Sequence, residues 1–158
     1  MTPAEIETRS FKIIDAEAGP HPFGPRQWTI VRRMVHTSAD FEYIRSIRFH
    51  DMAVDAGIGA LRQGKTIFTD TNMARVGINS GRLDRFNASV KCLMTDPAVG
   101  QTAAEQGITR ARAAVDAAAE DMAGGIYVVG NAPTALLRLM ELVARKEAAP
   151  ALIVGLPV

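Results

Sequence analysis

The sequence predicts an α/β fold in which a mainly parallel sheet is covered by helices on both faces. Segments with helical spacing of apolar residues alternate along the chain with four short apolar runs, each bounded by Gly, Pro, Asp or Lys, as buried parallel strands are. The four runs are 65–70, 88–94, 125–130 and 151–155. In such sheets ligands bind beyond the carboxyl ends of the strands, so we expect a site at that edge.

Helices are predicted over most of the remaining chain. Residues 3–17 form the first, which ends at the Gly19-Pro20 turn. The next is expected to start with Pro25 in its first turn and to reach His36 near its carboxyl end. Residues 41–49 alternate loosely and predict a short strand. The other predicted helices are 51–63, 98–105, 109–122 and 133–146, and Ser80 is a candidate helix cap.

Size and composition predict one domain spanning residues 1–158, because 47% hydrophobic residues suffice for one core. A net charge of +1 does not favour nucleic-acid binding. The single cysteine, Cys92, excludes a disulfide framework within the chain and fits a reducing cytoplasm. No signal-peptide core and no apolar run of membrane-spanning length is present, so we expect a soluble cytoplasmic protein that binds no membrane.

The segment Val31 to Asp40, VRRMVHTSAD, surrounds His36 with two arginines, two hydroxyl residues and an acid. Histidine is suited to proton transfer near neutral pH, and arginines suit an anionic substrate. Adjacent Arg32 and Arg33 would point about 100° apart on a helix, so only Arg33 is expected to share a face with His36. The alternatives are an incidental histidine at a helix end and an arginine that is merely solvated.

The turn Gly130-Asn131-Ala132-Pro133-Thr134 follows an apolar strand and opens an apolar helix. We predict that its free backbone N–H groups face a ligand and hold an anion. The turn lacks the Lys-Ser/Thr of a Walker motif and the glycine triplet of a dinucleotide motif, so it gives little support to nucleotide binding. The alternative is a plain strand-to-helix connection with Pro133 in the first helical turn.

His21 and His50 are poorer candidates for a functional role. His21 lies between two prolines in an expected surface loop, and His50 precedes an Asp that could cap the next helix. Together with His36 they are scattered too widely to form a recognisable metal site, so no metal is predicted.

Four segments, taken in order and spacing, resemble the precorrin-8X methylmutase family. The resemblance extends from about Glu7 to Val158, and the combination of RMVH with GNAPTAL is its most specific part. The segments are Arg9-Ser10-Phe11-x-Ile13-Ile14, Arg33-Met34-Val35-His36, Thr69-Asp70-Thr71-Asn72-Met73 and Gly130-Asn131-Ala132-Pro133-Thr134-Ala135-Leu136.

The resemblance implies a flavodoxin-like three-layer α/β/α fold with a mainly parallel sheet, and a homodimer. It also implies an isomerase of corrin construction on the way to cobalamin, which moves a methyl group from C-11 to C-12 of the macrocycle without a separate cofactor. The implied substrate is a polyanionic tetrapyrrole, either metal-free or already containing cobalt. The family's catalytic histidine falls on His36.

The substrate-binding residues that the resemblance implies carry charges or hydroxyl groups, and the turn described above adds two more. Protonation of the conjugated ring by His36 would ease a methyl shift, and a positioned general acid contributes about 10²- to 10⁴-fold. Charge-assisted hydrogen bonds would orient the rim carboxylates, and Met34, Met73 and Phe11 are candidates for an apolar surface under the ring. The expected binding residues are Ser10, Arg33, Arg110, Asn131 and Thr134.

Two alternative functions remain open from the sequence. Family members usually extend further, through another strand and a final helix, so this chain is expected to lack them and to leave an apolar sheet edge exposed. A non-catalytic corrinoid-binding protein with the same fold is therefore one alternative. The other is a small flavodoxin-like module that binds a nucleotide or flavin, which the alternating strands and the GNAPT turn suggest.

Overall fold

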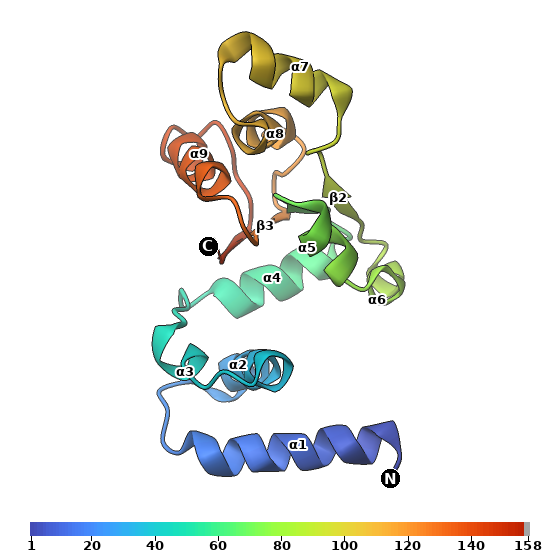
Figure 1. Cartoon of the computed structure of the whole chain (residues 1–158), viewed down its shortest axis with the longest axis vertical. Helices are drawn as coiled ribbons and strands as arrows, with labels where there is room; N and C mark the ends of the chain where they lie inside the picture. The colour runs from blue at the N-terminus through green and yellow to red at the C-terminus, as the bar shows by residue number, and fades with distance from the viewer. Residues whose placement is uncertain (157–158) are drawn as a thin grey trace. The chain divides into compact units, whose positions relative to one another are not determined.

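The computed structural model describes residues 1–156, which divide into two compact units (Figure 1). The first unit contains residues 1–54, and the second begins at Asp55. Within the described residues, every helix is too short or too polar to cross a membrane.

The first unit contains three helices: α1 (Pro3–Ala18), α2 (Pro25–Ser38) and α3 (Tyr43–Ser46). The predicted helix at the amino end is confirmed, and it begins with a capping box in which the Thr2 hydroxyl accepts from the Glu5 N–H and the Glu5 carboxylate accepts from the Thr2 N–H. Pro25 occupies the first turn of α2 as predicted, and the helix ends at Ala39, whose φ of 55° is left-handed.

The strand predicted over residues 41–49 is wrong, because this segment contains the short helix α3. The reason lies in the core of the first unit, which consists of buried Ile14, Val31 and Val35. All four apolar residues of the segment that suggested alternation pack against this one core, and a single helical turn brings them there. They are Phe41, Tyr43, Ile47 and Phe49.

The second unit contains a four-stranded parallel sheet with the order β2-β1-β3-β4. All four predicted strands are confirmed, each between one and four residues shorter than expected, and the α/β fold class is confirmed with them. In the central strands, Ile67 of β1 lies opposite Val90 of β2 and Ile126 of β3. The strands are β1 (Ile67–Thr69), β2 (Val90–Cys92), β3 (Ile126–Val129) and β4 (Leu152–Gly155).

Helices connect the strands, and the longer ones agree with the sequence. They are α4 (Ala53–Arg62), α7 (Pro97–Gln106), α8 (Arg110–Ala118) and α9 (Pro133–Ala144), with the short helices α5 (Asn72–Gly77), α6 (Ser80–Leu83) and η1 (Asp84–Phe86). Of the three short helices, only α6 was indicated by the sequence, through the candidate cap at Ser80. Ser80 is the first residue of α6 rather than its cap, because the Asn79 side chain accepts the hydrogen bond from Arg82 N–H.

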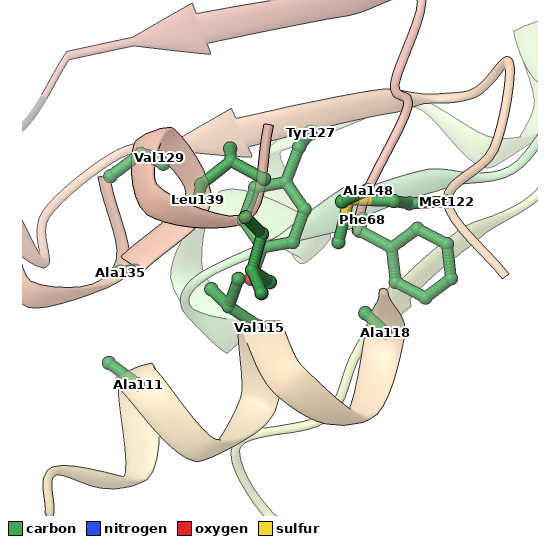
Figure 2. Close-up of a cluster of buried hydrophobic side chains, with 11 residues drawn as sticks. Phe68, Ala111, Val115, Ala118, Met122, Tyr127, Val129, Ala135, Leu139 and Ala148 are labelled. Atoms are coloured by element: carbon green, nitrogen blue, oxygen red, sulfur yellow. The ribbon is translucent and has the colours of Figure 1, made fainter. Parts of the chain in front are cut away.

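Side chains of successive strand residues point to opposite faces of the sheet. Helices cover both faces, so the second unit has three layers. Phe68 and Tyr127 pack with α8 and α9 in one buried cluster, in which Val115 and Leu139 are fully covered (Figure 2). Their neighbours Ile67 and Ile126 pack with α4 and α6 on the other face; this second cluster includes Ala60 and Leu83. The three-layer arrangement is the flavodoxin-like one that the sequence led us to expect.

Candidate active site

His36 lies in the last turn of α2, with its ring against Phe11 of α1. The ring centroids are 5.1 Å apart and the planes meet at 66°, an edge-to-face arrangement. The imidazole is half-buried, and neither of its nitrogens has a hydrogen-bond partner among residues 1–156. Both nitrogens are therefore available to a ligand.

Arg33 and Arg32 both approach the same Phe11 ring. Their Cζ atoms lie 4.7 Å and 4.4 Å from its centroid, respectively. Both guanidinium groups therefore reach the ring that His36 contacts, because both side chains are long enough to bend toward it although their Cα–Cβ directions diverge. The expectation that Arg33 is the arginine on the same helix face as His36 stays a prediction. The two differ in exposure, at 49% of the side chain for Arg33 and 25% for Arg32.

Each of the two arginines is paired with an acid of α1. Arg33 Nη1 lies 2.6 Å from Glu7 Oε1, and Arg32 Nη1 lies 2.8 Å from Asp15 Oδ2. The hydrogen bond that Arg33 donates to Glu7 raises the pKa of Arg33, which keeps the guanidinium charged at every physiological pH. Because Arg33 is the more exposed of the two, it is the better placed to meet an anion from solvent.

Ser10 is the half-buried residue that precedes Phe11 on α1. Its hydroxyl makes no hydrogen bond within the described part of the chain, whereas Thr8 on the same helix donates to the Ala4 carbonyl at 2.8 Å. The first unit thus brings His36 and Arg33 together at Phe11, with the Ser10 hydroxyl free next to it in sequence.

In the second unit, the buried carboxylate of Asp70 lies at the carboxyl end of β1. It accepts three backbone hydrogen bonds from the turn after β3: from Gly130 at 2.9 Å, from Asn131 at 2.9 Å and from Ala132 at 2.6 Å. Strands β1 and β3 are the neighbours from which the sheet is extended in opposite directions, the position at which doubly wound sheets usually bind ligands. Here the protein's own carboxylate occupies that position.

The prediction that the GNAPT turn offers free N–H groups to an anion is therefore wrong for residues 130–132. Those donors already face a charged acceptor, and a phosphate would have to displace it. Sequence reasoning placed Asp70 only at a loop edge and in a family motif. The feature of the sequence that could have predicted this contact is an acid directly after a buried strand, because its carboxylate can accept hydrogen bonds from the unpaired N–H groups of a neighbouring turn. Burial raises the pKa of neighbouring Tyr127, and the Asp70 charge raises it further.

Arg110, Asn131 and Thr134 lie at the amino-terminal ends of α8 and α9. Thr109 links these two helix ends: its hydroxyl caps α8 by accepting from Arg112 N–H and donates to Thr134 Oγ1 at 3.0 Å. Arg110 is exposed, and its guanidinium lies over Gly100 of α7, where an added Cβ would be 3.8 Å from Arg110 Cζ. The Asn131 side chain is exposed too.

The other two histidines, His21 and His50, contact neighbouring residues of their own loops and helices. His21 stacks on Trp28 with ring centroids 4.0 Å apart, and His50 Nδ1 accepts from Met52 N–H at 3.2 Å. Within residues 1–156, no three His, Cys, Asp or Glu side chains gather as metal ligands would.

The sheet order and the switch point between β1 and β3 define a doubly wound α/β protein of the flavodoxin-like class. The family model "Precorrin-8X methylmutase" matches residues 5–158. This chain belongs to the precorrin-8X methylmutase family, so the resemblance noted in its sequence is confirmed.

Solved structures and characterised relatives agree with this assignment. The precorrin-8x methyl mutase of Thermus thermophilus has a TM-score of 0.88 and 46% identity, over 98% of this chain and 75% of that one. The cobalt-precorrin-8 methylmutase of Priestia megaterium is 44% identical, over 100% of this chain and 70% of that protein. The precorrin-8X methylmutase of Sinorhizobium sp. is 38% identical, over 97% and 72%. The relatives are methylmutases, that is, intramolecular transferases.

Proposed function

We propose that this chain is an isomerase of cobalamin biosynthesis, which moves a methyl group from C-11 to C-12 of precorrin-8X or cobalt-precorrin-8. The observation that carries this proposal is the family match over residues 5–158. A relative named for cobalt-precorrin-8 and a relative named for precorrin-8X both match nearly the whole chain, so both substrates belong in the assay.

His36 is proposed as the general acid. A protonated imidazole donates its proton to the conjugated macrocycle, the methyl group migrates within the same molecule, and the proton is then lost again, so the substrate and product are isomers. A positioned acid of this kind contributes about 10²- to 10⁴-fold to the rate. The free ring nitrogens of His36 support this role, because no hydrogen bond within residues 1–156 has to break before the proton moves.

Substrate carboxylates are proposed to bind Arg33, which is half exposed, and the Ser10 hydroxyl beside it in sequence. A carboxylate arriving at Arg33 would replace Glu7 in a charge-assisted hydrogen bond of the same kind. In the second unit the proposed binding residues are Arg110, Asn131 and Thr134. The Thr134 oxygen accepts from Thr109, which leaves its own O–H free to donate.

The proposal also covers the oligomeric state, the cellular location, the cofactor requirement and the partners of the protein. We expect a homodimer in the cytoplasm, as the family resemblance implies. The reaction is redox-neutral and rearranges one molecule, so it is proposed to need no separate cofactor. A net charge of +1 supports neither a nucleic-acid nor a membrane partner.

The proposal is tested by changing His36→Gln and measuring conversion of precorrin-8X and of cobalt-precorrin-8. We expect turnover to fall by about 10²- to 10⁴-fold, while corrinoid binding, read by absorbance after desalting, persists. The matched control is His50→Gln, which removes an exposed histidine that contacts its own loop. Unchanged turnover in His36→Gln would refute the role of His36.

The same experiment separates the two alternatives. A chain that retains corrinoid product tightly but converts neither substrate would be a corrinoid-binding protein. Retention of flavin instead of corrinoid would indicate the flavodoxin-like nucleotide module. The structure argues against the latter, because Asp70 occupies the three N–H groups that a phosphate at the switch point would use.

A further inference from the structure

Phe11 contacts three side chains that carry or can carry a positive charge. The Arg32 and Arg33 Cζ atoms lie 4.4 Å and 4.7 Å from its ring centroid, and the His36 ring meets it edge-to-face at 5.1 Å. Cations gather at an aromatic ring because its faces carry partial negative charge. One uncharged side chain on α1 therefore forms a common support for the proposed acid and for the proposed anion-binding arginine.

The ring itself is anchored by the core of the first unit. Phe11 is half-buried and packs against the cluster of Ile14, Val31 and Val35, and this packing restricts the position of its ring. Helix α1 also supplies both acids that hold the guanidinium groups, Glu7 for Arg33 and Asp15 for Arg32. The contacts at Phe11 therefore bind α1 to the last two turns of α2.

Polar groups of two side chains next to the Phe11 ring lack hydrogen-bond partners in the described structure. Arg32 Nε is buried without a hydrogen-bond partner in the described structure, and the ring face beside this guanidinium offers it an electrostatic substitute. His36 has no hydrogen bond to either nitrogen within residues 1–156. A hydrogen bond to the second ring nitrogen often orients a functional histidine. At His36 the edge-to-face contact with Phe11 is instead the ring contact that the structure shows.

We propose that Phe11 is the positioning residue of this site: its ring orients the His36 imidazole and sets the place of the Arg33 guanidinium beside it. The proposal rests on the proposed role of His36 as the acid. It replaces the sequence expectation that Phe11 forms an apolar floor under the macrocycle, because the ring contacts the protein's own cations.

The sharpest test keeps the shape of the ring and changes its charge distribution. Phenylalanine at position 11 is replaced site-specifically by its 4-fluoro, 3,5-difluoro and pentafluoro analogues, which progressively withdraw electron density from the ring. We expect kcat to fall stepwise, by about 10-fold at the end of the series, with KM and the thermal unfolding midpoint little changed. Phe11→Leu should lower kcat at least as much as the pentafluoro analogue does. Phe11→Trp, whose ring has a stronger quadrupole, should keep most of the parent kcat.

Phe49 provides the matched control, because it meets Phe23 edge-to-face at 5.9 Å in the same unit and contacts no cation among the described residues. The same fluorinated series at position 49 should leave kcat unchanged. A kcat that stays constant along the Phe11 series overturns the proposal. A loss that appears in KM alone also overturns it, because Phe11 would then be a substrate contact.

A spectroscopic readout keeps this test separate from the proposed activity. By NMR, the His36 ring protons and Arg33 Hδ protons should show ring-current shifts that vanish in Phe11→Leu and persist in Phe11→Trp. If the unmodified chain converts neither substrate while these shifts behave as expected, the proposed function fails and the positioning of His36 stands. Unchanged shifts in Phe11→Leu overturn the positioning, whatever the activity.

Discussion

Asp70 decides the conformation of a turn that lies 60 to 62 residues further along the chain. A buried carboxylate is stable only when its oxygens are hydrogen-bonded, and here three N–H groups satisfy it. Those donors belong to the first residues after β3, which have no strand partner for them. The carboxylate and the three N–H groups satisfy one another, and neither the segment around Asp70 nor the turn 130–132 predicts this pairing from its own sequence.

Asp70→Ala should destabilise the protein strongly. It leaves three partly buried N–H groups of the turn without their acceptor, and each such loss costs up to about 1–3 kcal/mol, so we expect a total of about 3 kcal/mol. Asp70→Asn keeps one acceptor oxygen and should fall between the alanine variant and the parent. Urea unfolding measures both changes.

Asp96→Ala is the matched control for Asp70. The exposed Asp96 carboxylate caps α7 by accepting from Ala98 N–H, so its removal should cost only about 1 kcal/mol. Equal losses for the two alanine variants would show that the Asp70 hydrogen bonds carry no special weight.

Helices α8 and α9 are joined on their outer side by a group of ion pairs. Arg138 donates to Asp116 at 2.6 Å and to Glu141 at 2.8 Å, and Arg112 reaches Glu141 at 3.3 Å. Helical periodicity predicts both helices, but it does not show that their polar faces meet. The hydrogen bond from Arg138 lowers the pKa of Glu141, and the charges of Arg112, Arg138 and Arg145 lower it further.

This lowered pKa predicts how the stability conferred by Glu141 depends on pH. A carboxyl group with a lower pKa in the folded state stabilises the fold above its ordinary pKa, and that stabilisation is lost as the pH falls through the folded value. Glu141→Gln should therefore be less stable than the parent near pH 7, and the difference should vanish once the pH is well below the ordinary value of 4.5. Thermal unfolding at a series of pH values measures it.

Glu147→Gln is the control, because Glu147 is exposed and makes no ion pair in the described residues. Its substitution should change stability little at any pH. A Glu141→Gln difference that is the same at pH 3 and pH 7 would contradict the expected linkage.

Helices were predictable where their apolar period runs over several turns, and strands where an apolar run is bounded by Gly, Pro, Asp or Lys, whereas short helices were missed. The helices around Pro25 and Pro133 and all four strands follow from apolar spacing and boundary residues. The segment 41–49 was mispredicted because a few apolar residues fit either period, and contact with the core of the first unit chose the helix. The short helices within residues 72–86 leave too few turns for any period to show.

At the scale of the whole molecule, one domain over residues 1–158 remains a prediction. The chain forms two compact units, each with its own buried apolar cluster. A single domain should unfold in one cooperative transition, with equal calorimetric and van 't Hoff enthalpies. Scanning calorimetry measures this, and two separate transitions would show that the units are independent domains.

The fold class, the family and the candidate residues follow from apolar periodicity and short ordered motifs, which are local properties of the chain. Which of those residues meet depends on the tertiary structure. It placed Arg32 as well as Arg33 on Phe11, and it turned the GNAPT N–H groups toward Asp70 rather than toward a ligand. The physical reason is that contacts across helices and strands depend on side-chain reach and on the pairing of buried polar groups, and neither is written in local sequence.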